Sequence, residues 1–167
     1  AAKYVRDAHG LLGIATDVTK DDDRQRLVDR ARDSFGGLDV LINNAGVCSW
    51  AHFVESSEEV LRTIMEVNFF GPADLIRRAI PLLTPGQRPA VVNVAAMCGR
   101  RGMPSFPEYS ASKFALCGLT EALRGELARF GIDVLLIVPG LTQSDLARVN
   151  SDLQQLDTLF DAVKTQA

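Results

Sequence analysis

The sequence predicts an α/β fold built on a doubly wound parallel sheet, similar to a Rossmann fold, with helices on both faces. Short, nearly continuous apolar runs alternate with longer amphipathic stretches, which is typical of parallel strands buried between helices. The runs cover residues 11–16, 38–42, 91–96 and 132–138. Small, polar or Gly-containing segments follow them, as expected where the carboxyl ends of parallel strands form a ligand-binding edge.

Capping and breaking residues place the helices between these strands. Thr19 is expected to cap a helix that starts near Lys20, and Gly36-Gly37 ends it. Ser56, with Glu59 three residues later, has the pattern of a capping box, and Gly71-Pro72 is expected to interrupt or bend the helix that follows. Further helices are predicted over residues 1–9, 109–130 and 144–164.

Composition limits the class of protein. The chain has 167 residues, 47% of them hydrophobic, which is enough for one globular domain over residues 1–167. The net charge is 18 − 21 = −3 and the basic residues are scattered, which argues against nucleic acid as a partner. No apolar run approaches the roughly 20 residues that span a membrane, and no signal-peptide pattern opens the chain. Three cysteines without C-x-x-C spacing and two histidines make no metal cluster, so we expect reduced thiols in a cytoplasmic protein.

Tyr109 and Lys113 are the first candidates for chemistry. They are four residues apart on a predicted helix, so their side chains share one face. A phenol with a pKa near ~10 is a poor base at neutral pH, and an adjacent cation favours the phenolate. The two residues are therefore a candidate proton-transfer pair.

The ordered motifs of the chain resemble the short-chain dehydrogenase/reductase family of the classical type. The matching pieces are Asp17-Val18, Asn43-Asn44-Ala45-Gly46, Asn68, Tyr109-x-x-x-Lys113 within Tyr-Ser-Ala-Ser-Lys, and Pro139-Gly140 with Thr142. They span nearly the whole chain in the family's order and with its spacing. The resemblance implies an NAD(P)-dependent oxidoreductase that interconverts an alcohol and a ketone by hydride transfer.

The resemblance also implies roles for single residues. Tyr109 would be the general acid/base, Lys113 would lower the pKa of the tyrosine and hold the nicotinamide ribose, and Asn68 would anchor a water in the proton relay. Asp17 and Val18 would contact adenine. The other residues expected along the NAD or NADP cofactor are Asn43, Asn44, Ala45, Gly46, Pro139, Gly140 and Thr142.

Ala96 departs from the family pattern. The family places a catalytic serine thirteen residues before the tyrosine, and position 109 − 13 = 96 holds an alanine. Loss of one such hydrogen-bond donor costs on the order of 10²–10³ in rate, so we expect impaired activity. The alternatives are an inactive member that serves in binding or assembly, a substitution made to trap a complex, or compensation by Cys98 or Ser105. Compensation is the weakest of these because a thiol is a poor donor.

A second departure concerns the phosphate groups of the cofactor. The family opens with a strand, a Gly-rich turn and a helix, and this chain has no G-x-G-x-x-G-like sequence. Strands 1 and 2 of the family fold are therefore absent, and in the order 3-2-1-4-5-6 they would lie between residues 11–16 and 38–42. The sequence thus predicts an incomplete sheet and an internal part of a longer chain. It leaves the choice between NAD and NADP open.

By resemblance, the chain would form a homodimer or homotetramer. The helices that carry Asn68 and Tyr109 would pair across a two-fold axis. Candidate interface residues are Phe69, Phe70, Leu116, Leu119 and Leu123. The substrate would be a small-molecule alcohol or carbonyl compound, whose identity the sequence leaves open.

Overall fold

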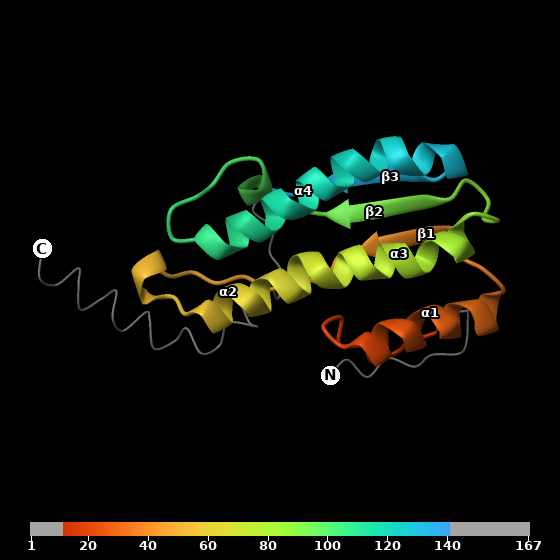
Figure 1. The fold of residues 1–167 in the computed structure, drawn as a ribbon, viewed down its shortest axis with the longest axis horizontal. Helices are drawn as coiled ribbons and strands as arrows, with labels where there is room; N and C mark the ends of the chain where they lie inside the picture. Colours follow the sequence, from red (N-terminus) through yellow and green to blue (C-terminus); the bar gives the residue numbers. More distant parts are fainter. Residues whose placement is uncertain (1–11, 141–167) are drawn as a thin grey trace, which may run out of the picture.

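The computed structural model describes residues 12–140. Its main elements are α1 (Asp21–Phe35), β1 (Val40–Asn43), α2 (Glu58–Met65), α3 (Gly71–Leu83), β2 (Ala90–Val94), α4 (Pro107–Leu127) and β3 (Asp133–Ile137) (Figure 1). A π-helical turn, Glu66–Phe70, joins α2 to α3, and 3-10 turns cover Phe53–Glu55, Met97–Gly99 and Ala128–Phe130. The helices predicted over 1–9 and 144–164 lie outside the described residues.

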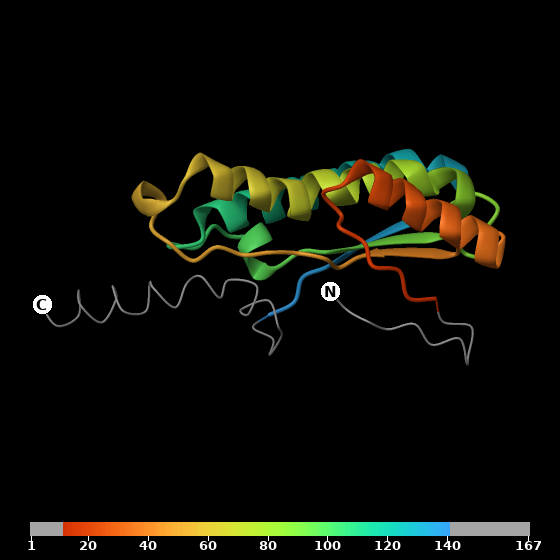
Figure 2. The ribbon, with the colours of Figure 1, turned by 90° about the horizontal axis from the view of Figure 1, so that it is seen from below.

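The strands β1, β2 and β3 form one parallel sheet in that order. Asn43 at the end of β1 pairs with Asn93 of β2, so the carboxyl ends of the strands meet at one edge. The described helices all lie on one face of this sheet (Figure 2). The parallel sheet is therefore confirmed, while the covering of both faces is not seen within residues 12–140, where Ile42 and Leu135 are exposed.

The strand predicted over residues 11–16 is wrong for the part that the structure describes. Residues 12–16 belong to no strand. A strand needs a neighbour to pair its N–H and C=O groups, and β1 pairs with β2 on one side only. An apolar run predicts burial, whereas strand formation also depends on the partner beside it.

The core lies between the sheet and the pair α3 and α4. It is formed by apolar side chains at helical spacing on α3 and α4 that meet alternate residues of the strands. Its buried members are Ile76, Ala79, Leu83, Val91, Leu127, Ile132 and Val134. This packing fixes α4, and with it the candidate proton-transfer pair, over β2 and β3.

Two predicted caps are displaced by one residue. Lys20 is the N-cap of α1 and makes no side-chain cap bond, since an ammonium group cannot accept one, and the Thr19 hydroxyl donates to Oδ1 of Asp17 at 2.7 Å. Ser57 caps α2, where its Oγ accepts a hydrogen bond from the backbone N–H of Val60 at 3.3 Å. Both helices exist as predicted, but Thr19 and Ser56 do not cap them.

The predicted interruption before residue 72 takes the form of the π turn, after which Gly71 and Pro72 open α3. Pro72 suits the first turn of a helix because its missing N–H would have no partner there. A Cβ on Gly71 would lie 2.8 Å from the carbonyl oxygen of Val18. Glycine therefore allows the chain around Val18 to pack directly against the start of α3.

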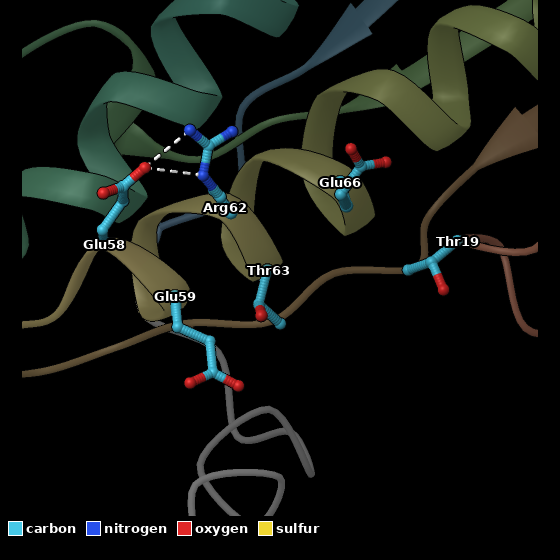
Figure 3. A pocket seen from close by; sticks show the side chains of 6 residues that line it. All are labelled: Thr19, Glu58, Glu59, Arg62, Thr63 and Glu66. Carbon is cyan, nitrogen blue, oxygen red and sulfur yellow. Dashed lines mark hydrogen bonds and ion pairs between the residues drawn. The ribbon is translucent and has the colours of Figure 1, made fainter.

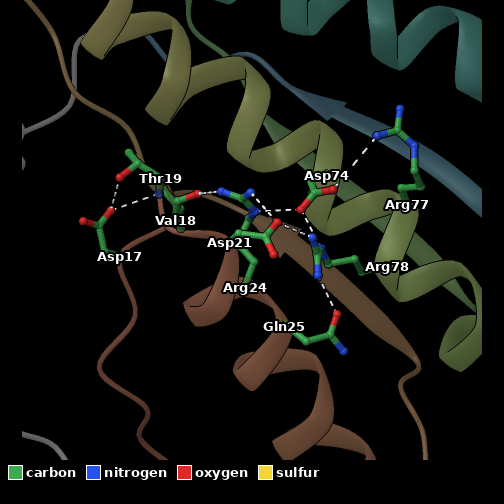
Figure 4. Close-up of polar contacts among 9 residues, drawn as sticks. All are labelled: Asp17, Val18, Thr19, Asp21, Arg24, Gln25, Asp74, Arg77 and Arg78. Atoms are coloured by element: carbon green, nitrogen blue, oxygen red, sulfur yellow. Dashed lines mark hydrogen bonds and ion pairs between the residues drawn. The ribbon is translucent and has the colours of Figure 1, made fainter.

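An ionic cluster holds α1 against α3 (Figure 4). Oδ2 of Asp74 accepts hydrogen bonds from Nε of Arg24 at 2.7 Å and from Nε of Arg78 at 2.6 Å. Burial alone would raise the pKa of the Asp74 carboxyl, but the hydrogen bonds from Arg78 and Arg24 outweigh it and hold that pKa below its usual value. Asp74 is thus a bridge between two helices.

Replacing Asp74 by asparagine is expected to lower the free energy of unfolding by about 1–2 kcal/mol at pH 7, because two charge-assisted hydrogen bonds are lost. A lowered folded-state pKa contributes stability that is present above the ordinary carboxyl pKa and is lost as the pH falls through the folded-state value. Urea denaturation at pH 7 and at pH 3 measures both effects. The control is Asp33→Asn, at an exposed ion pair with Arg32. Equal losses for the two variants would contradict the bridging role.

Candidate active site

Tyr109 and Lys113 lie in the first turns of α4, on its buried face. Their side chains are 7% and 4% exposed, and Nζ of Lys113 lies 5.8 Å from the centroid of the Tyr109 ring. Nζ also donates a hydrogen bond to the carbonyl oxygen of Val94 at 3.0 Å. Since Val94 is the last residue of β2, this bond fixes the pair at the carboxyl end of the sheet.

Asn68 joins this pair to the loop after β1. Nδ2 of Asn68 donates to the carbonyl oxygen of Val47 and to Oγ of Ser112, both at 2.9 Å, and Oδ1 accepts from the N–H of Val47 at 2.9 Å. Oγ of Ser112 in turn donates to the carbonyl oxygen of Tyr109 at 2.8 Å. The π turn places the fully buried Asn68 where it can bridge two segments that are remote in sequence.

Gly46 lies against both Asn68 and Lys113. A Cβ at this position would be 3.3 Å from Oδ1 of Asn68 and 3.5 Å from Nζ of Lys113. A larger side chain would therefore push on both groups. Of the residues predicted from sequence, the structure brings Gly46, Asn68, Tyr109 and Lys113 together.

Burial dominates the electrostatics of the pair. It raises the pKa of Tyr109 to about 12, and the Cys48 and Cys98 thiols add to the effect. Burial likewise lowers the pKa of Lys113. The expectation that Lys113 lowers the pKa of the tyrosine stays a prediction, since burial is the largest influence on Tyr109 here. The Lys113 ammonium is itself desolvated and donates to Val94.

Ala96 follows β2 and precedes the turn Met97–Gly99. Its methyl group offers no hydrogen bond. The thiol of Cys98 donates to the Met103 sulfur at 3.3 Å, and the carbonyl of Ser105 accepts from the N–H of Ala51 at 3.0 Å. Cys98 is therefore already engaged, which weighs against compensation by its thiol.

The residues expected along the cofactor differ in their exposure, and the structure does not gather them at one place. Nδ2 of Asn43 donates to Oδ1 of Asn93 at 2.8 Å inside the protein, so the Asn43 side chain points away from the strand edge. Asn44, Ala45 and Gly140 are exposed. Pro139 is half-buried, and Thr142 lies outside the described residues. A cofactor contact by any of them stays a prediction.

Asp17 and Val18 form a turn that lies beside the start of α3 and does not join the group around Lys113. Oδ1 of Asp17 accepts from the N–H of Thr19 at 2.9 Å, and the carbonyl of Val18 accepts from Arg24 at 2.8 Å. The hydrogen bonds from Thr19 lower the pKa of the Asp17 carboxyl. A contact with adenine from either residue is not tested by this geometry.

Sequence reasoning missed the buried polar residues that support the site. Nδ2 of Asn93 donates to Oγ1 of Thr120 at 2.9 Å, which ties β2 to α4, and Ser112 completes the bridge from Asn68. A polar residue within an otherwise apolar strand, such as Asn93 in Val-Val-Asn-Val, was an available signal. Glu108 is also buried, and its carboxylate accepts from Oγ of Ser49 at 3.4 Å.

An open pocket shares no lining residue with this site (Figure 3). It is lined by Thr19 and by residues of α2 and the π turn, namely Glu58, Glu59, Arg62, Thr63 and Glu66. Arg62 is already paired with Glu58 at 2.6 Å. The remaining carboxylates would repel phosphate groups, so the pocket does not suit a dinucleotide. Within residues 12–140 no cluster of His, Cys, Asp and Glu side chains could hold a metal ion.

Comparison with known proteins identifies the class. The short chain dehydrogenase family model matches residues 1–155, and the chain belongs to this family. It is 38% identical over 140 residues to an uncharacterized oxidoreductase of Thermotoga maritima, covering 83% of this chain and 55% of that protein. It is 36% identical to the CLA biosynthesis dehydrogenase/reductase of Lactiplantibacillus plantarum, covering 81% of this chain and 49% of that protein.

Solved structures agree with the fold. A short chain dehydrogenase/reductase from Burkholderia phymatum, crystallised with NAD, matches with a TM-score of 0.79 at 31% identity and covers 82% of this chain and 50% of its own. A short chain dehydrogenase from Burkholderia cenocepacia, crystallised with NADP, matches with a TM-score of 0.74 at 33% identity, covering 82% and 58%. The chain thus spans about half the length of the relatives it matches. No helix among residues 12–140 is both long and apolar enough to cross a membrane.

Proposed function

We propose that this chain carries the proton-transfer half of an NAD(P)-dependent oxidoreductase that interconverts an alcohol and a ketone. The observation that carries the proposal is the convergence of Tyr109, Lys113 and Asn68 at the carboxyl end of β2. Lys113 bonds to the last residue of that strand, and Asn68 bonds through Ser112 to the helix turn that holds Tyr109. Burying a lysine costs solvation energy, and lysines are rarely fully buried, so the 4% exposure of Lys113 favours a functional role over a purely structural one.

In this proposal Tyr109 moves a proton to or from the substrate oxygen. Within residues 12–140 its hydroxyl has no hydrogen-bond partner, which leaves it available to a substrate. A pKa of about 12 makes the phenol an acid that holds its proton at neutral pH, and this favours the direction of carbonyl reduction. Asn68 positions the loop around Gly46 against the pair.

The side chains fit one end of a nicotinamide cofactor. Lys113 has three N–H donors and uses one on Val94, so two can meet ribose hydroxyls. The nicotinamide, when bound, would supply or accept the hydride. The sequence of this chain holds no Gly-rich turn for the pyrophosphate, so we assign it no residues for that group and leave NAD and NADP as equal candidates.

Ala96 favours a second candidate, in which the protein binds or assembles without turnover. The half-exposed Phe70 supports a homodimer or homotetramer in either case, whereas Leu116 is buried within the chain and would not contribute to an interface. None of the three cysteines, Cys48, Cys98 and Cys117, is in a disulfide, which supports a reducing, cytoplasmic location. The substrate in the first candidate is a small alcohol or carbonyl compound.

Replacing Tyr109 by phenylalanine is expected to abolish whatever oxidoreduction the chain performs, at least about 10²-fold, because the proton donor is lost. The test follows the absorbance of reduced nicotinamide with a panel of alcohols and ketones. With Tyr109 intact, alcohol oxidation should rise with pH between pH 7 and pH 10, since the phenolate fraction grows below a pKa of about 12. A Tyr109→Phe variant with an unchanged rate and the same pH profile would overturn the assignment.

A further inference from the structure

The loop after β1 is tied to neighbouring segments through residues 47, 49 and 51. The backbone of Val47 bonds to the amide of Asn68, as described above. The N–H of Ala51 donates to the carbonyl of Ser105 at 3.0 Å, just before α4 begins. Between these two bonds lies Ser49, which is buried and turns its hydroxyl toward α4. The loop is therefore fastened along the end of α4 that carries the candidate proton donor.

The partner of Ser49 is a buried carboxylate. Oγ of Ser49 donates to Oε2 of Glu108 at 3.4 Å, and Glu108 is only 2% exposed. Burying an ionised carboxylate is costly, and within residues 12–140 no basic side chain forms an ion pair with it. Its place in the first turn of α4 offsets part of that cost, because the helix dipole is positive there. In this part of the chain, the Ser49 hydroxyl is the one side-chain group that bonds to it.

The helix turn that Glu108 anchors also carries Tyr109. The two residues are consecutive in α4, and Tyr109 is itself buried. The titratable groups that face the phenol are the thiols of Cys48 and Cys98, together with Lys113, whose Nζ lies 5.8 Å from the centre of the ring. The loop after β1 therefore takes part in enclosing Tyr109, because Cys48 belongs to it. A loop released from α4 would let water reach the phenol.

We infer that Glu108 is a positioning residue of the proposed proton transfer, which together with Ser49 forms a latch that holds the loop after β1 against α4 and keeps water from Tyr109. This inference rests on the proposed function and adds two residues to it. A phenol kept out of water retains its proton for the substrate oxygen instead of exchanging it with solvent. Glu108 does not touch the reacting atoms in this arrangement; it acts through the position of the loop.

The test measures how Tyr109 titrates, with no need for turnover. The chain has two tyrosines, so Tyr4→Phe leaves Tyr109 as the single one, and the ultraviolet absorbance of its phenolate is read just after a rapid pH jump. Opening the latch admits water, which favours the charged phenolate. In Glu108→Ala and in Ser49→Ala the pKa of Tyr109 is therefore expected to fall from about 12 to about 11 or lower. A pKa that stays at the parent's value in both variants would overturn the inference.

A conservative variant separates the bond from the bulk of the side chain. Glu108→Gln keeps an amide oxygen that can accept from Ser49, so it is expected to titrate like the parent. Combining Ser49→Ala with Glu108→Ala should lower the pKa of Tyr109 no further than the larger single change, because both break the same bond. If Glu108→Gln lowers that pKa as much as Glu108→Ala does, the hydrogen bond is not the latch and the inference fails.

A control on the same helix excludes a general effect of losing a carboxylate. Glu121→Ala removes an exposed carboxylate of α4 that pairs with Arg100, and it is expected to leave the titration of Tyr109 unchanged. Urea denaturation of each variant shows whether it is folded, and if Glu108→Ala is not, Ser49→Ala decides. A lowered urea midpoint with an unchanged titration would mean that Glu108 only stabilises the helix start, against the inference. The expected titration in a chain that never turns over nicotinamide would refute the proposed function and leave the latch in place.

Discussion

Replacing Ala96 by serine is expected to raise the rate of carbonyl reduction by about 10²–10³-fold, because it restores a hydrogen-bond donor where charge develops on the substrate oxygen. Ala96 lies two residues after Val94, the strand end at which Lys113 is anchored, and its side chain is half-buried. A donor fixed there would act with Tyr109 on the same oxygen. The measurement is the initial rate of nicotinamide oxidation at saturating cofactor and ketone.

The control for this gain is Ala111→Ser, which adds the same hydroxyl at an exposed position of α4. It is expected to leave the rate unchanged. Adding Tyr109→Phe to the Ala96→Ser variant should remove the gain, since the hydroxyl stabilises a charge that only the tyrosine can protonate. Should Ala96→Ser bind cofactor with the parent's affinity and still show no turnover, the oxidoreductase proposal would give way to a binding or assembly role.

The sequence was informative about those elements whose burial depends on their own residues. The apolar runs around Val91 and Val134 are strands, because each is packed beneath α3 and α4 with a partner at its side. The run over residues 12–16 has a similar composition and is no strand, because pairing requires a neighbour. Hydrophobic pattern alone does not carry that information.

The predicted N-cap residue of α1 was wrong for a related reason. Thr19 is a good N-cap by residue type, but its hydroxyl is nearer to a stronger acceptor, the carboxylate of Asp17. The choice between two local acceptors depends on the turn geometry and is not visible in a motif. An error of one residue at a helix end is the result, and the helix itself is still present.

Some features of the candidate site can be predicted from local sequence and others depend on tertiary contacts. Helical spacing predicts that Tyr109 and Lys113 share a face, and both are on the buried face of α4. The direction of the tyrosine pKa could not be predicted from the pair alone, because it depends on burial and on the Cys48 and Cys98 thiols, which come from other segments of the chain. The orientation of Asn43 could not be predicted from sequence either. At a strand end, the face on which a side chain lies decides whether it bonds within the protein, as Asn43 does with Asn93, or faces a ligand.

Removing the side chain of Asn68 is expected to destabilise the protein by about 3 kcal/mol, because it leaves the N–H and C=O of Val47 and the hydroxyl of Ser112 without their buried partner. Asn68→Ala should therefore shift the midpoint of urea denaturation to clearly lower concentration. In the same loop, Asn44→Ala changes an exposed amide and should lower the free energy of unfolding by less than about 0.5 kcal/mol.

The same variant separates a supporting role of Asn68 from a purely chemical one. If its amide mainly holds the loop around Gly46 against α4, Asn68→Ala should lose stability and turnover together, since Gly46 in that loop lies against Lys113. If stability is unchanged while turnover alone falls, the bridge from Val47 to Ser112 does not hold the site, and Asn68 acts on the proton path instead. The double variant with Ser112→Ala decides between them: a shared bridge predicts that the second loss is smaller than that of Ser112→Ala alone, because both changes break the same hydrogen bond.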